Sequence, residues 1–243
     1  MSGIVYQMKP ERVIILNDKK EKLVGYLYKN TSKTIVIICH GVEPVLGFPG
    51  VTDVFETYHS IGVSVFPFDF TGYGESEGKK RVSLKQRVSD IGKVIDHFSQ
   101  DYDEIILYGL SFGGISVAIA ANTYKKVAKI ITINGFFSFN PRKMYGNQSL
   151  AIGMYLLTHP ESWSEISYWL THFRGKGISV PTLVVYGEAD TDVKPIQSLS
   201  FFNRLQGRKE LVGVPGGDHL LMNKEQWPLM HAIYEWLAEG VKK

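Results

Sequence analysis

The sequence of 243 residues lacks the features that define several large classes of protein. Its single cysteine, Cys39, excludes a disulfide within the chain and any metal site built on several cysteines. No apolar run approaches the roughly 18 residues that a membrane-spanning helix needs. The net charge is only +3 and is spread along the chain, which argues against a nucleic-acid-binding surface.

The N-terminal segment also lacks the pattern of a secretory signal. Residues 1–10 show no basic start followed by an apolar stretch, so we expect a cytoplasmic protein. Hydrophobic residues make up 44% of the chain and charged residues 21%, which are ordinary globular proportions and exclude a disordered chain. A chain of this length buries a sizeable core without disulfides.

Short apolar segments, many of them rich in β-branched residues, recur along the chain. Most are continuously apolar rather than alternating, which is typical of strands that are covered on both faces of a parallel sheet. The predicted strands are Arg12–Leu16, Leu23–Tyr28, Thr34–Cys39, Val63–Phe68, Glu104–Tyr108, Ile130–Ile133, Thr182–Tyr186 and Glu210–Val214.

Helical patterns lie between these strands. Apolar residues at Leu84, Val88, Ile91, Ile95 and Phe98 follow helical spacing. Residues 112–122 are small and apolar on nearly all sides, which indicates a buried helix, and residues 227–237 predict a closing amphipathic helix. Strands that alternate with helices predict an α/β fold.

One region, residues 136–175, interrupts this alternation. It has no strand pattern, lies between two predicted strands, and is aromatic: Phe136, Phe137, Phe139, Tyr145, Tyr155, Trp163, Tyr168, Trp169 and Phe173. We expect a helical cap over one end of the sheet, with several of these rings forming an apolar pocket. The alternative is a helical layer that contacts no ligand.

A candidate nucleophile lies where a predicted strand runs directly into a helix. Gly109-Leu110-Ser111-Phe112-Gly113 matches G-x-S-x-G, in which small residues permit a strained serine at a sharp turn. A serine needs a base to accept its proton, and the base needs an acid to orient it. His219 follows the last predicted strand, and the loop after the preceding strand offers Asp190 or Asp192.

The order Ser111, Asp190, His219 resembles that of the α/β-hydrolase superfamily, and the resemblance covers nearly the whole chain. Two further motifs carry it. Residues 69–76 resemble the family's D-x-x-G-x-G-x-S turn, and residues 187–195 match its G-x-x-D-x-x-V-x-P motif, with Asp190 as the acid. The resemblance therefore favours Asp190 over Asp192.

The resemblance also implies an oxyanion hole and an architecture. The loop His40-Gly41-Val42 would supply the backbone N–H of Val42, and the residue after the nucleophile would supply that of Phe112. The implied fold is a mostly parallel eight-stranded sheet flanked by helices, with a short helical cap inserted after the sixth strand. The core would comprise residues 1–135 and 176–243, and the cap residues 136–175.

The function implied is that of a serine carboxylesterase similar to cinnamoyl and feruloyl esterases and to monoacylglycerol lipases. It would cleave esters of small to medium apolar or aryl acyl groups through an acyl-serine, with no cofactor and no metal. The expected partner is a small ester; no nucleic acid and no membrane span are expected, and the oligomeric state stays open, a homodimer included.

Two classes of alternative remain. One is a thioesterase or a peptidase of the same fold, and the other is a non-enzymatic ligand receptor on the hydrolase scaffold. A peptidase of the proline-aminopeptidase type usually needs acidic residues in its cap to hold an amine. Glu161 and Glu165 are the only acids in residues 136–175, so this alternative is less favoured.

Overall fold

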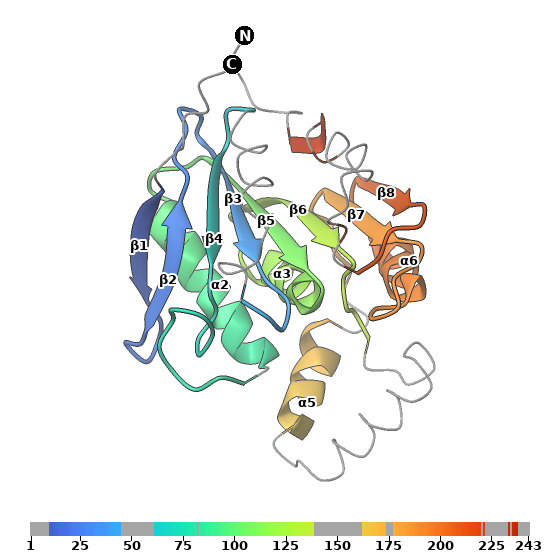
Figure 1. The fold of residues 1–243 in the computed structure, drawn as a ribbon, viewed down its shortest axis with the longest axis horizontal. Coiled ribbons are helices and arrows are strands. Elements are labelled where there is room, and N and C mark those ends of the chain that lie inside the picture. The colour runs from blue at the N-terminus through green and yellow to red at the C-terminus, as the bar shows by residue number, and fades with distance from the viewer. Residues whose placement is uncertain are drawn as a thin grey trace.

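The structure is a computed structural model that describes residues 10–44, 61–81, 83–138, 162–173, 177–219, 221, 233 and 235–237. It contains an eight-stranded sheet with the order β1-β2-β4-β3-β5-β6-β7-β8 (Figure 1). The strands are β1 Glu11–Leu16, β2 Lys22–Leu27, β3 Thr34–Cys39, β4 Ser64–Phe68, β5 Glu104–Leu110, β6 Val127–Ile133, β7 Thr182–Gly187 and β8 Lys209–Val214.

The sheet is parallel from β4 to β8, whereas β1 and β2 pair antiparallel at one edge. Every residue of β3 and β4 is buried, as the continuous apolar runs predicted. This mostly parallel sheet with flanking helices confirms the predicted α/β-hydrolase fold. The carboxyl ends of β3 to β8 all reach the same edge of the sheet, which gathers the loops that follow them.

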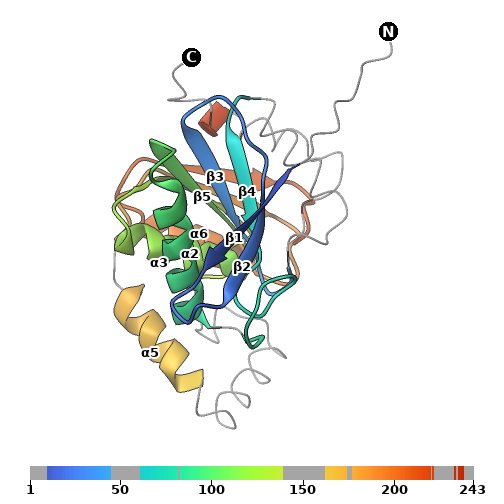
Figure 2. The same ribbon diagram turned by 90° about the vertical axis from the view of Figure 1, so that its left-hand side faces the viewer.

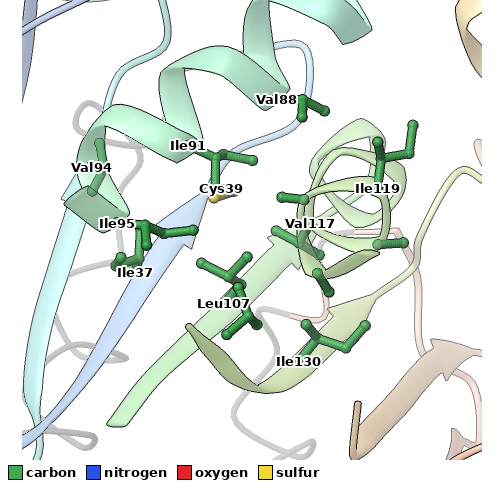
Figure 3. Close-up of a cluster of buried hydrophobic side chains, with 14 of the residues drawn as sticks. Ile37, Cys39, Val88, Ile91, Val94, Ile95, Leu107, Val117, Ile119 and Ile130 are labelled. Atoms are coloured by element: carbon green, nitrogen blue, oxygen red, sulfur yellow. The ribbon is translucent and has the colours of Figure 1, made fainter. Parts of the chain in front are cut away.

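Four longer helices accompany the sheet within the described residues: α2 Leu84–Phe98, α3 Phe112–Thr123, α5 Ser162–His172 and α6 Pro195–Arg204. Helices α2 and α3 lie side by side on one face of the sheet (Figures 1 and 2). Ile91 and Ile95 of α2, together with Val117 of α3, point toward Ile37 and Leu107 of the strands (Figure 3). This packing anchors the two helices that border the candidate site.

The opposite face of the sheet has its own core, in which Val36, Ile38 and Ile106 pack with Trp236 and Leu237 near the C-terminus. Of the predicted closing helix 227–237, Ile233 and residues 235–237 are described, and they are helical. Helix α6 was not predicted from the sequence. No helix in the described part of the chain is long and apolar enough to cross a membrane.

Of the region 136–175, the structure describes residues 136–138, 162–173 and no others. Helix α5 packs against α2 and lies beyond the carboxyl ends of the strands (Figures 1 and 2). Phe137, Trp169 and Phe173 are buried in the core, where Phe137 stacks on Phe201 of α6 at 3.9 Å between ring centroids. These three rings pack in the core, because burial against the body of the protein is an equally good use of an aromatic side chain, and the predicted pocket would have to be formed by other rings of the region.

Other aromatic residues of the region lie elsewhere. Trp163 is 57% exposed, and Tyr168 stacks on His172 along α5. Phe139, Tyr145 and Tyr155 lie outside the described residues, so their predicted place in a pocket stays a prediction.

Candidate active site

Ser111 occupies a sharp turn between the end of β5 and the start of α3. Its backbone has φ 53° and ψ −120°, a strained conformation for a residue other than glycine. Hydrogen bonds hold this turn on both sides: Ser111 N–H donates to the Ile133 carbonyl, and the Ser111 carbonyl accepts from the N–H groups of Gly114 and Phe136, each at 2.9 Å. The strain is therefore maintained by β6 and by the chain that leaves it.

Glycine is required beside the serine because backbone segments approach closely there. A Cβ atom at Gly113 would collide with the Cys39 carbonyl at the end of β3. A Cβ atom at Gly41 would lie 3.0 Å from Cβ and 3.4 Å from Oγ of Ser111. The His40-Gly41-Val42 loop thus runs directly against the serine side chain, as expected of a loop that supplies an oxyanion donor.

The acid and the histidine are in contact. His219 Nδ1 lies 2.8 Å from Asp190 Oδ2, and because a carboxylate only accepts, Nδ1 carries the proton and donates it. Asp190 is 2% exposed, and its Oδ1 accepts from the backbone N–H groups of Asp192 and Val193, each at 2.8 Å. Asp192 therefore contributes a backbone donor to the Asp190 carboxylate, and it is Asp190 that contacts the imidazole.

The two predicted oxyanion donors are the backbone N–H groups of Phe112, which directly follows the serine, and of Val42, which directly follows Gly41. Phe112 is the first residue of α3, where an N–H has no partner within the helix and the helix dipole favours negative charge. Val42 is the last residue of the His40-Gly41-Val42 loop, in which Gly41 lies against Ser111, and the residue is 48% exposed. Phe136, half-buried, packs on the Phe112 ring at 5.8 Å and places a second ring beside the serine backbone.

His40 is a buried structural residue of this loop. It is 1% exposed, its Nε2 accepts from Phe70 N–H at 3.1 Å, and its Nδ1 therefore donates to the Gly41 carbonyl at 2.9 Å. Burial, with a smaller contribution from the charge of Arg87, lowers the pKa of His40 to about 3. The ring is neutral at physiological pH, and both nitrogens are engaged.

A residue that no sequence motif singled out joins the loops of this site. Asn134, directly after β6, is 1% exposed and has a positive φ of 47°. Its Nδ2 donates to the carbonyls of Asp218 and His219 at 3.0 and 2.8 Å, and its Oδ1 accepts from Gly187 N–H at 2.7 Å. One amide thus holds the loop that carries His219 and the strand end that leads to Asp190.

Other acidic residues and histidines near the site or in the region 136–175 are exposed, have structural partners or lie outside the described residues. Asp218 is exposed, and Glu165 of α5 accepts from Ser83 Oγ and Leu84 N–H at the start of α2, at 2.8 and 2.6 Å. His172 is exposed on α5, while His159 and Glu161 lie outside the described residues. No group of three or more His, Cys, Asp and Glu residues in the described ranges is placed to hold a metal ion.

Comparison with known proteins assigns the chain to a family. The model of the prolyl oligopeptidase family matches residues 68–243, well over half of the chain. The chain belongs to this family. The α/β-hydrolase fold is confirmed as well, because Est1E from Butyrivibrio proteoclasticus, solved with ferulic acid bound, superposes with a TM-score of 0.73 at 21% identity over 95% of this chain and 100% of that one.

Two curated relatives of this prolyl oligopeptidase family member match part of its length. An uncharacterized membrane protein of Saccharomyces cerevisiae is 31% identical over 143 residues, which are 56% of this chain and 48% of that protein. Monoglyceride lipase of Mus musculus is 28% identical over 116 residues, 46% of this chain and 38% of the lipase. The chain spans about half the length of the curated relatives it matches, or less. Family and fold together class it among the α/β-hydrolases.

Proposed function

We propose that this family member is a serine carboxylesterase with Ser111 as nucleophile, His219 as base and then acid, and Asp190 as the residue that orients His219. One observation carries the proposal. The hydrogen bond from His219 Nδ1 to Asp190 Oδ2 leaves Nε2 as the ring's proton acceptor, in the protein that also holds Ser111 at a strained strand-to-helix turn.

The proposed reaction begins when Ser111 Oγ attacks the acyl carbon of the ester and His219 Nε2 takes the Oγ proton. The carbonyl oxygen becomes an oxyanion that accepts from the N–H groups of Val42 and Phe112. His219 then gives its proton to the leaving alcohol oxygen, which leaves an acyl-serine. Water attacks this ester while His219 again takes the proton, and His219 then returns a proton to Ser111 Oγ as the bond to the acyl carbon breaks and the carboxylic acid is released.

An apolar or aryl acyl group of small to medium size is the proposed substrate. The half-buried ring of Phe136 supports this choice: its backbone N–H bonds the Ser111 carbonyl, its ring packs on Phe112, and aromatic faces favour apolar and aryl groups. The structural neighbour Est1E was solved with ferulic acid, an aryl acid. Cinnamoyl and feruloyl esters are therefore the first substrates to test, with monoacylglycerols next.

The test is a panel of p-nitrophenyl esters of increasing chain length, together with methyl ferulate and methyl cinnamate. We expect Ser111→Ala to lower kcat on the order of 10⁴- to 10⁶-fold, because only binding and the oxyanion hole remain. Ser116→Ala is the matched control: it removes a buried serine hydroxyl of the same helix that bonds the Phe112 carbonyl. Undiminished hydrolysis in purified Ser111→Ala would overturn the mechanism and favour a ligand receptor.

Amide hydrolysis is the second candidate, and membership of the prolyl oligopeptidase family favours it. The same triad cleaves amides when a site also holds the peptide. Both carboxylate oxygens of Glu165 accept hydrogen bonds from the start of α2, which argues against a role for Glu165 in binding a substrate amine. A p-nitroanilide panel run beside the esters separates the two, and a higher kcat/KM on anilides than on matched esters would favour the peptidase.

A further inference from the structure

A buried arginine lies behind the loop that supplies one oxyanion donor. Arg87, in the first turns of α2, is only 2% exposed. Its Nη1 donates to the His40 carbonyl at 2.8 Å, and its Nη2 donates to the Gly41 carbonyl at 2.7 Å. The planar fork of the guanidinium thus binds two successive carbonyls of the loop that touches Ser111.

A cation in this position is costly, and this cost argues against a purely space-filling role. No described carboxylate lies within 4.0 Å of the guanidinium nitrogens, and the buried Nε has no hydrogen-bond partner among the described residues. Burial lowers the pKa of Arg87. The guanidinium lies over the rings of Phe70 and Phe112 at 4.3 and 5.4 Å, and an apolar side chain would fill the same space without the desolvation cost.

The contacts converge on one peptide group. The Gly41 carbonyl accepts from Arg87 Nη2 and also from His40 Nδ1 at 2.9 Å, so both of its lone pairs are used. In a planar trans peptide the N–H of the next residue points opposite to the carbonyl. Two donors that hold the Gly41 carbonyl therefore also determine where the Val42 N–H points.

The same two hydrogen bonds change the strength of that N–H as a donor. Hydrogen bonds in series polarise one another, and a charge-assisted bond to the carbonyl draws electron density from the amide nitrogen of the same peptide. A more polarised N–H binds a developing negative charge more strongly than it binds a neutral carbonyl. Because the transition state is stabilised more than the bound substrate, the activation barrier falls and kcat rises.

We propose that Arg87 is a positioning residue of the oxyanion hole, which orients and polarises the Gly41–Val42 peptide so that the Val42 N–H receives the oxyanion formed on attack by Ser111. This inference rests on the proposed function. It predicts that the loss of Arg87 lowers kcat and leaves KM nearly unchanged, because the contact acts on the transition state.

The experiment compares wild type with Arg87→Met, Arg87→Lys and the control Val88→Ala. Met removes charge and donors at similar volume, whereas Lys keeps the charge but lacks the fork that reaches both carbonyls. Val88 is the buried neighbour on the same helix, and an apolar side chain cannot donate to the loop carbonyls, so its truncation controls for a general loss of stability. Two readouts are taken: kcat and KM on p-nitrophenyl acetate, and the ¹⁵N and ¹H chemical shifts of the Val42 amide.

We expect Arg87→Met to lower kcat on the order of 10- to 100-fold, somewhat less than the roughly 10²- to 10³-fold cost of removing an oxyanion donor outright. Its Val42 amide resonance should move upfield as the Gly41 carbonyl loses its charged partner. The kcat and the Val42 resonance of Arg87→Lys should lie between those of the wild type and Arg87→Met. Val88→Ala should lower Tm without lowering kcat at 25 °C.

Three outcomes would overturn the inference. One is a folded Arg87→Met with wild-type kcat, and another is a fall in kcat that Val88→Ala reproduces. The third is a fall in kcat with the Val42 resonance unmoved. A wild type without Ser111-dependent turnover would instead overturn the proposed function, and this inference with it, so the two failures are distinguishable by the wild-type and Ser111→Ala controls.

Discussion

Asn134→Asp is the substitution that most directly tests how the loops of the site are held together. The change is isosteric: one oxygen still accepts from Gly187 N–H, but the group that donated to the carbonyls of Asp218 and His219 becomes a second oxygen. Two hydrogen bonds are lost at about 1 kcal/mol each, and the two carbonyls face an acceptor, which adds about 1 to 2 kcal/mol. We expect a loss of about 3 to 4 kcal/mol in the free energy of unfolding at neutral pH.

The loss should depend on pH. Burial raises the pKa of a carboxyl at this 1%-exposed position above the ordinary value of about 3.9, so the native state binds the proton more tightly than the unfolded state does. The destabilisation is then smallest at low pH, where the acid is protonated and donates to one carbonyl. It grows as pH rises through the native-state pKa.

We expect kcat to fall as well, for a reason separate from the loss of stability. A His219 carbonyl without its anchor lets the imidazole move, and a displacement near 1 Å costs up to about 100-fold in kcat. The assay combines urea midpoints at pH 5 and pH 7 with kcat on p-nitrophenyl acetate. Asn134→Gly is the matched control, because it removes the same bonds at a φ of 47° without adding an ionisable group, so its destabilisation should not change with pH. An Asn134→Asp protein with wild-type kcat and a loss below about 1 kcal/mol would refute this account.

Three further predictions concern Gly41, His40 and Phe137. Gly41→Ala should lower kcat on the order of 100-fold with little change in Tm, because its Cβ would press on Ser111; a wild-type kcat would contradict it. Burial lowers the pKa of His40 to about 3, so between pH 6.5 and 3 the unfolded state binds a proton that the native state does not. The free energy of unfolding should therefore fall by about 2 kcal/mol from pH 7 to pH 5. Urea midpoints of His40→Asn should change less with pH than those of the wild type. Phe137→Ala should cost about 3 to 5 kcal/mol in thermal or urea unfolding while KM for aryl esters stays constant, whereas a raised KM with intact stability would restore the pocket role of that ring.

Local signals predicted most of the sheet. The segment Thr34–Cys39 forms a strand with the predicted bounds, because continuous β-branched residues suit a strand buried on both faces. Strand β5 extends two residues past its predicted end, to Leu110. The sequence motif indicated a turn at Gly109, but in the sheet Gly109 still pairs with Cys39 of β3. Helix α6 escaped prediction, and its buried positions Gln197, Ser198 and Phe201 include two polar residues that weaken the apolar pattern.

The aromatic region 136–175 shows what composition alone cannot predict, namely the partner of each ring. Nothing in the sequence distinguishes a ring that meets a ligand from one that meets the core, since both environments favour aromatic side chains. Phe137 and Phe173 reach the core because α6 brings Phe201 against them, and Trp169 donates from Nε1 to the Phe137 carbonyl at 3.2 Å. These partners come from elements that lie well apart in the chain.

The α/β order of the elements and the candidate residues Ser111, Asp190 and His219 could be predicted from local motifs, because each motif depends on spacing within a single loop. The residues that hold these loops in place became visible only when the chain was folded. Asn134 meets a carbonyl 85 residues away, and Arg87 meets carbonyls 46 and 47 residues away. Along the chain both look like ordinary polar residues, one after a strand and one on a helix. Their roles arise because parallel strands place the loops at their carboxyl ends side by side, and a buried amide or guanidinium must find its hydrogen-bond partners there.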